Sequence, residues 1–197
     1  TGHKGLYGPP GTGGMVLSGR AAAEMAALVQ GGTGSRSDEE LQPGMLPDKF
    51  EPGTPNTLGI AGLGAGIRFV LQCGVNQIGM HELGLASEFV QAARAIPGIR
   101  LFGPWETDTS AAVCASDRVA TVSVGFASAQ ADPSRAAYLL DRDFGIMVRS
   151  GLHCAPLAHR TLGTFPAGTL RFSFGWFNTI SDARDAAGAL ARIAEAL

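Results

Sequence analysis

Lysine is scarce in this chain, and one of its two lysines lies in a glycine-rich stretch near the start. Lys4 stands in GHKGLYGP (residues 2–9), where the glycines let the backbone approach a bound group closely. An amine that forms a Schiff base with a carbonyl cofactor must lose its proton, which a partly desolvated lysine can do and an arginine cannot. The residues alone leave two readings open: a covalent anchor, or an exposed lysine near the terminus.

A cysteine in the second half of the chain is the next candidate for chemistry. Cys154 lies in RSGLHCAP (residues 149–156), on a loop after an expected strand. Thiol reactivity requires the thiolate, which partial exposure and nearby cations favour, and Arg149 and His153 are the cations at hand. A small buried residue is the alternative for Cys154, as it is the expectation for Cys73 and Cys114 in their apolar surroundings.

An arginine follows within an alternating segment. In TLRFSF (residues 169–174), Leu170, Phe172 and Phe174 are expected to face a core, so that Arg171 faces away from it. A guanidinium held on a strand offers a rigid bidentate fork for a substrate carboxylate. A solvated arginine on an outer sheet face is the alternative.

Two further patterns point to no site. The stretch GPPGTGGM (residues 8–15) imitates a phosphate-binding P-loop, but Gly14 stands where that motif has its lysine and Met15 where it has a serine or threonine. The residues His153, Cys154 and His159 match no common zinc spacing. We therefore expect neither a nucleotide site nor a metal site.

The elements that would position these residues follow from periodicity and from helix start and stop signals. Asp132-Pro133 predicts an N-cap and first turn for a helix that closes at Gly145, and Ser181 is a candidate cap for the last helix. The segment 31–57 is rich in glycine and proline, and we expect a functional loop there. The predicted helices are 21–29, 58–73, 75–96, 132–144 and 181–197, and the predicted strands are 15–17, 99–102, 119–126, 146–148 and 170–174.

Composition narrows the class of protein. The chain has 197 residues, 45% of them hydrophobic and 16% charged, which is typical of a globular domain. Its 15 basic and 17 acidic residues form no positive stripe, so we expect neither nucleic acid nor a membrane surface as a partner. Three scattered cysteines favour a reducing, cytoplasmic setting over a disulfide framework. Because the chain starts at Thr1 without a methionine, we expect a fragment.

Five motifs in order resemble the second half of one enzyme family. They are GHKGLYGP (2–9), GGTGS (31–35), FEPGTPNT (50–57), RSGLHCAP (149–156) and TLRFS (169–173). Together they resemble the class-V aminotransferase-fold enzymes that use pyridoxal 5′-phosphate (PLP), specifically the cysteine desulfurases and selenocysteine lyases. The resemblance implies an α/β fold: the end of the large PLP-binding domain of a type I PLP-dependent transferase (1–57), connecting helices (58–98) and a small α+β C-terminal domain (99–197) that carries the cysteine loop.

The resemblance also implies a cofactor site. Lys4 matches the lysine that holds PLP covalently, and His3 matches its usual neighbour. Thr54 matches a residue that reaches across a homodimer interface to the PLP phosphate of the partner subunit, and 31–34 matches a loop against that same site. The family's ring-stacking histidine and its aspartate for the pyridine nitrogen lie in an N-terminal half that this chain lacks. We therefore expect the chain alone to bind PLP poorly and to show little activity.

The substrate side of the resemblance involves three residues. Arg171 matches the arginine that binds the substrate α-carboxylate, and Arg149 matches the arginine at the end of a strand near the mouth of the site. Cys154 matches the nucleophile that takes sulfur from L-cysteine, or selenium from selenocysteine, leaving alanine and a persulfide for an acceptor protein, as in iron–sulfur cluster assembly. The alternatives are another class-V PLP lyase or aminotransferase, for which a thiol at 154 has no use, and an inactive C-terminal fragment.

Overall fold

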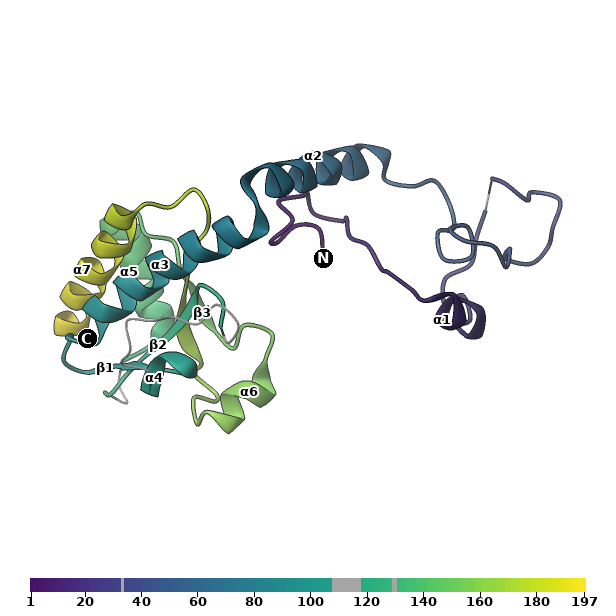
Figure 1. The fold of residues 1–197 in the computed structure, drawn as a ribbon. Helices are drawn as coiled ribbons and strands as arrows, with labels where there is room; N and C mark the ends of the chain where they lie inside the picture. Colours follow the sequence, from purple (N-terminus) through teal and green to yellow (C-terminus); the bar gives the residue numbers. More distant parts are fainter. Residues whose placement is uncertain (33, 108–117, 129–130) are drawn as a thin grey trace. The chain divides into compact units, whose positions relative to one another are not determined.

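The computed structural model describes residues 1–197 except 33, 108–117 and 129–130, so Cys114 lies outside the described residues. The chain divides into two compact units, Thr1–Gly74 and Val75–Leu197 (Figure 1). This division falls within the segment 58–98 that was expected to connect two domains. The boundaries at 57/58 and 98/99 stay a prediction.

The second unit is a mixed α/β layer built on a small antiparallel sheet. Its strands are β1 (Ile99–Leu101), β2 (Thr121–Phe126), β3 (Arg149–Gly151) and β4 (Thr169–Ser173), in the spatial order β1-β2-β4-β3. All three pairings are antiparallel. The helices of this unit are α3 (Val75–Ala93), α4 (Pro104–Thr107), α5 (Pro133–Phe144), α6 (Pro156–Thr161) and α7 (Ile180–Ala196).

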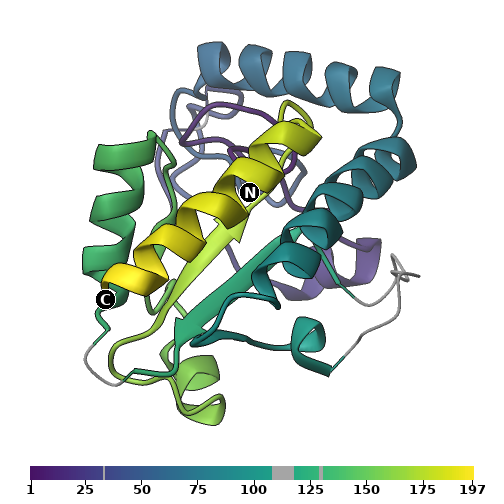
Figure 2. The same ribbon diagram turned by 90° about the vertical axis from the view of Figure 1, so that its left-hand side faces the viewer.

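One face of the sheet is covered by α3, α5 and α7, which lie in front of the strands in Figure 2. The strands alternate as expected: Val122, Val124, Leu170 and Phe172 are buried beneath these helices. Phe89 of α3 is fully buried, and its ring centroid lies 4.4 Å from that of Phe172. Burying this layer leaves the intervening residues of β2 and β4 on the opposite face, where polar side chains gather.

The helix ends follow local capping chemistry. The Asp132 carboxylate accepts a hydrogen bond from the Ser134 backbone N–H at 2.8 Å, and Gly145 ends α5 in a left-handed conformation with φ 65°, both as predicted. The cap predicted at Ser181 is wrong. Thr179 begins α7 in a capping box, in which the Asp182 carboxylate also accepts from the Thr179 N–H, because this reciprocal pair satisfies two donors where Ser181 would satisfy one.

Two predicted strands are not strands, and both fail for want of a partner strand. The apolar segment 146–148 leads from α5 into β3 without joining the sheet, although Ile146 and Val148 pack against the core and Met147 is 85% exposed. Residues 15–17 belong to no helix or strand, and Val16 is fully exposed. Alternating or apolar residues indicate that a segment could form a strand, but the segment becomes one only when its backbone forms hydrogen bonds with a neighbouring strand.

The first unit holds two helices, α1 (Gly19–Glu24) and α2 (Thr57–Cys73). The predicted α2 is confirmed, whereas α1 ends five residues before the predicted Val29. Beyond Glu24 the side chains of Leu28 and Val29 are exposed, so no buried apolar face supports further helical turns. Among the described residues, no single helix is long and apolar enough to cross a membrane; α2 and α3 meet that criterion only as a bent pair.

Candidate functional site

Lys4 lies on a tight turn near the start of the first unit. The Tyr7 backbone N–H donates to the Lys4 carbonyl at 2.9 Å, and the Gly8 N–H donates to the Gly2 carbonyl at 2.8 Å. Tyr7 takes a left-handed φ of 54°, which is unusual for an aromatic residue. The Lys4 side chain is exposed and forms no hydrogen bond or ion pair with any described residue, so its amine is available to a ligand. His3 beside it is also exposed.

The turn rests on α2. The rings of Tyr7 and Phe69 meet edge to face with centroids 5.4 Å apart, a favoured geometry for an aromatic pair. The Thr12 backbone carbonyl accepts from the Gly2 N–H at 2.9 Å, which closes the base of the turn. These contacts hold the Lys4 backbone in one conformation and leave the side chain outside.

The two motifs of the 31–57 segment, GGTGS (31–35) and FEPGTPNT (50–57), are connected by a backbone hydrogen bond. The Gly53 N–H donates to the Gly32 carbonyl at 2.5 Å, and Gly53 has a left-handed φ of 80°. Asn56 caps α2 by accepting from the Gly59 N–H at 3.0 Å. Between Gly53 and this cap, Thr54 presents an exposed hydroxyl that no described residue binds. The expected functional loop therefore has a defined backbone at Thr54.

In the second unit, the ladder places two arginines directly opposite one another. Arg149 of β3 pairs in register with Arg171 of β4, and Arg171 pairs on its other side with Ser123 of β2. Like charges directly opposite on neighbouring strands are destabilising. No carboxylate in the described part of the chain forms an ion pair with either guanidinium. The pair is therefore suited to an external anion.

Buried polar atoms beside this pair also lack partners. The Arg171 Nε and the Thr169 hydroxyl are buried and form no hydrogen bond within the part of the chain that the structure describes. Thr169 stands two residues before Arg171 on β4, and it therefore faces the same side of the sheet. Sequence reasoning missed Thr169, although the alternation that placed Arg171 also placed Thr169. Buried donors without partners in a fold are uncommon and are consistent with a ligand that would satisfy them.

Cys154 lies next to this pair. The Arg149 Nη2 donates to the Cys154 Sγ at 3.4 Å, and the thiol is exposed. His153 Nε2 donates to the Arg149 carbonyl at 3.0 Å. His153 and Cys154 both take left-handed φ values, 52° and 62°, so Arg149 holds a strained loop through its backbone and its side chain.

The surroundings of His153 favour the neutral form of its imidazole. Burial of the ring lowers the His153 pKa from its usual 6.5. The hydrogen bond to the Arg149 carbonyl raises it in part, and the nearby charges of Arg171, His159 and Arg149 lower it further. A carbonyl only accepts, so the ring nitrogen at Arg149 carries a proton. His159 is buried, and its Nδ1 lies 2.7 Å from the Thr164 hydroxyl. The described residues contain no cluster of three or more metal-binding side chains.

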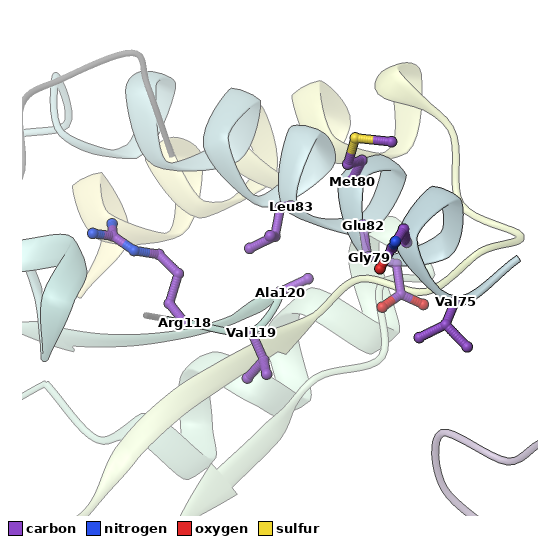
Figure 3. Close-up of a pocket in the computed structure, with 9 residues that line it drawn as sticks. Val75, Gly79, Met80, Glu82, Leu83, Arg118, Val119 and Ala120 are labelled. Carbon is purple, nitrogen blue, oxygen red and sulfur yellow. The ribbon is translucent and has the colours of Figure 1, made fainter. Parts of the chain in front are cut away.

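A separate hollow of about 540 Å³ lies between α3 and the segment before β2 (Figure 3). Its lining is mostly apolar, with side chains such as Met80, Leu83 and Val119, and it has charged groups at Glu82 and Arg118. The Arg118 guanidinium stacks on the Trp105 ring at 4.6 Å. Among the described residues that line this hollow there is no cysteine, serine, threonine or lysine, and we assign no chemistry to it.

The sequence-predicted site residues thus form two groups. Arg149, Cys154 and Arg171 meet in the second unit, while Lys4, His3 and Thr54 belong to the first. That the Lys4 amine and the Cys154 thiol converge on one pocket stays a prediction.

Comparison with known proteins gives consistent similarities. Residues 1–185 match the family model for class-V aminotransferases. A cysteine desulfurase of Klebsiella pneumoniae is 36% identical over 199 residues, covering 98% of this chain and 44% of that protein. A probable cysteine desulfurase of Methanothermobacter thermautotrophicus is 34% identical over 182 residues, covering 90% of this chain and 42% of that protein. The chain therefore spans less than half the length of these relatives.

Similar solved structures belong to the same enzyme group as these relatives. The crystal structure of the cysteine desulfurase CsdA (S-sulfonic acid) from Escherichia coli superposes with a TM-score of 0.81 at 29% identity, covering all of this chain and 45% of that one. An apo cysteine desulfurase from Thermococcus onnurineus has a TM-score of 0.66 at 30% identity, covering 77% of this chain and 34% of that one. The mixed α/β fold with its small antiparallel sheet is thus shared with this enzyme group.

Proposed function

The chain belongs to the class-V aminotransferase family, and on that premise we propose that it supplies part of the active site of a PLP-dependent cysteine desulfurase. The observation that carries the proposal is the cluster of Arg149, Cys154 and Arg171 at the sheet face opposite to the one that α3, α5 and α7 cover. There an exposed thiol accepts a hydrogen bond from Arg149, and Arg149 stands in register with Arg171. A cation pair to which no described residue offers a carboxylate, beside a free thiol, suits a substrate that is both an acid and a source of sulfur.

The residues of the first unit fit the cofactor in two respects. Lys4 offers an exposed primary amine on a fixed turn, as covalent attachment to an aldehyde requires. Thr54 offers an exposed hydroxyl on a loop whose backbone is fixed by the Gly53–Gly32 hydrogen bond, which suits a phosphate oxygen. We propose that Lys4, with His3 beside it, holds PLP, and that Thr54 serves the phosphate of the partner subunit in a homodimer. When bound, PLP supplies an electron sink for bond breaking at the substrate.

Arg171 binds the substrate α-carboxylate in this proposal. Its Nε–H is buried and unpartnered, so a carboxylate oxygen would satisfy a donor that the fold leaves open. Arg149 stands opposite and adds a second positive charge at the mouth of the same site. The carboxylate would also relieve the repulsion between the two guanidinium groups.

Cys154 takes the sulfur. Its Sγ forms an S–S bond to the substrate sulfur while the bond from that sulfur to the substrate carbon breaks. The electron pair of the broken bond stays with the carbon fragment, which takes a proton and leaves as alanine. The product on the protein is a persulfide at Cys154, and the exposure of this thiol would let an acceptor protein reach it. Selenocysteine would react in the same way.

The free thiols indicate the kind of cellular compartment in which the protein would work. Cys73 and Cys154 are both free, and a persulfide is stable only where oxidants are scarce, so we propose a reducing compartment such as the cytoplasm. Another class-V lyase or aminotransferase is the second candidate for the family, but it would leave the contact between Arg149 and Cys154 without a use.

The test compares Cys154→Ser with Cys73→Ser in the protein expressed from its native gene. Both variants should be labelled at Lys4 by PLP and borohydride, as read by mass spectrometry. The Cys73 variant should release alanine from L-cysteine and carry a persulfide, and the Cys154 variant should do neither. Equal sulfur release by the two variants, or labelling of the parent protein away from Lys4, would refute the proposal.

A further inference from the structure

The face of α2 that receives the Lys4 turn is made of glycine. Gly59, Gly62 and Gly66 follow one another at intervals of three and four residues, so they share one side of the helix. Each glycine lowers the intrinsic stability of a helix by about 1 kcal/mol relative to alanine. A helix that keeps three of them in a row on one face has a packing reason for doing so.

That reason is the close approach of the turn. A Cβ at Gly66 would lie 2.3 Å from the Leu6 carbonyl oxygen and 2.9 Å from the carbonyl carbon and oxygen of Tyr7. A Cβ at Gly62 would lie 3.1 Å from two ring carbons of Pro9. These atoms belong to backbone or to a rigid ring, so they cannot rotate away as the end of a flexible side chain could.

The same helix carries its own control. Gly64 stands on the other side of α2, and a Cβ there would meet only the Arg68 Nη1, at an ordinary 3.6 Å. Alanine at 64 therefore changes helix propensity without touching the turn. Any effect confined to Gly66 and Gly62 comes from the contact with the turn.

We propose that the glycine face of α2 sets the position of the Lys4 amine, and that Gly66 is the positioning residue. The inference rests on the proposed function, in which Lys4 holds PLP. Leu6 lies two residues beyond Lys4, within the turn closed by the hydrogen bond from the Tyr7 N–H to the Lys4 carbonyl. A methyl group at 66 must open a 2.3 Å contact to at least 3.0 Å, which displaces the turn or the helix by 0.7 Å or more.

A displacement of this size matters for covalent chemistry. Misplacing a reacting group by about 1 Å can slow a reaction by about 100-fold, because the attacking atom leaves its productive geometry. Gly66→Ala should therefore slow covalent labelling of Lys4 at saturating PLP by roughly 10- to 100-fold. Gly62→Ala should slow it less, since a 3.1 Å contact requires only a small adjustment. Gly64→Ala should label at the parent rate.

The experiment uses these three variants in the protein expressed from its native gene. The first measurement is the rate of borohydride-trapped PLP labelling at Lys4, followed by mass spectrometry. The second is amide hydrogen exchange at Tyr7 and Gly8 without cofactor, which reports the turn itself. In Gly66→Ala both amides should exchange at least several-fold faster than in the parent protein. The thermal midpoint of this variant should show that it is still folded at the labelling temperature, so that unfolding does not explain the slower labelling.

The outcomes separate the inference from the proposed function. Parent-like labelling and exchange in Gly66→Ala would overturn the inference, as would equal effects at 64 and 66. If Gly66→Ala does not fold, the comparison of Gly62→Ala with Gly64→Ala decides in the same way. Absence of Lys4 labelling in the parent protein would refute the proposed function, and the exchange rates would still show whether α2 holds the turn.

Discussion

Replacing Arg171 with methionine should stabilise the second unit while abolishing its response to carboxylates. Two features of the fold oppose Arg171 in the absence of a ligand. Its charge faces that of Arg149 in register across β3 and β4, and its Nε–H is buried without an acceptor. Methionine matches the aliphatic stem of arginine, so Arg171→Met removes both features and leaves most of the packing in place.

The magnitude follows from these two terms. A like-charge pair opposite on neighbouring strands costs up to about 1 kcal/mol, and a buried donor without a partner costs about 1–3 kcal/mol. Because the Arg171 side chain is only partly buried, we expect a net gain of about 1–2 kcal/mol. For a cooperative unit the size of Val75–Leu197, that raises the thermal midpoint by roughly 4–8 °C.

The assay is thermal unfolding with and without a small amino acid such as L-alanine. Arg135 on α5 is exposed and supplies the control, because Arg135→Met should change stability by less than about 0.5 kcal/mol. The parent protein and the control should gain stability from the ligand, and Arg171→Met should not. A lower midpoint for Arg171→Met without ligand would show that the fold itself needs the guanidinium, and the argument for an anion site would fail.

Three further predictions test the packing, the capping and the charges of the second unit. Phe89→Ala should lower the free energy of unfolding by about 3–5 kcal/mol in urea denaturation, because the Phe89 ring is fully buried against Phe172; a loss below 1 kcal/mol would contradict this core. Thr179→Ala should cost about 1 kcal/mol and Ser181→Ala clearly less, and the reverse order would restore the cap predicted from the sequence. The His153 pKa is lower in the folded chain than its usual 6.5, so the unfolded chain binds more protons and the free energy of unfolding should fall as the pH drops below about 6.5. His153→Gln should make the free energy of unfolding, measured by urea denaturation, depend less on pH between about pH 5 and 8. An unchanged pH dependence would refute the lowered pKa.

The parts of the fold that were predictable carry local signals. Asp132, Pro133 and Gly145 mark both ends of α5 with side chains that act within one turn, and the structure keeps all three in those roles. Thr179 was overlooked because the competing cap, Ser181, lies only two residues away and the reciprocal hydrogen bond of Asp182 decides between them. Short-range hydrogen bonding thus explains both the success and the error.

The register of the sheet was not predictable in the same way. Alternation placed Arg171 on the polar face, but nothing local to residue 149 says that it belongs to a strand or which residue of β4 stands opposite. The apolar run 146–148 looked like the better strand, and β3 instead begins where that run ends. A slip of one residue would turn Arg149 to the helix-covered face, so the pairing of the two arginines depends on a contact between segments 22 residues apart.

The glycines of α2 show the opposite case. Their spacing is visible in the sequence, but the sequence does not show what packs against them. The helix Thr57–Cys73 contains four glycines, and helix propensity alone counts each of them against the element. Three have a use once the turn lies on them: Gly66 and Gly62 admit the backbone and ring that follow Lys4, and Gly59 lies close to Thr12 at the base of the turn. Gly64 meets nothing but an arginine terminus. Spacing separates the first three from the fourth, but only a partner surface tells whether a glycine face binds a neighbour or merely weakens a helix. A residue that costs local stability can thus admit a turn that lies some sixty positions away in sequence.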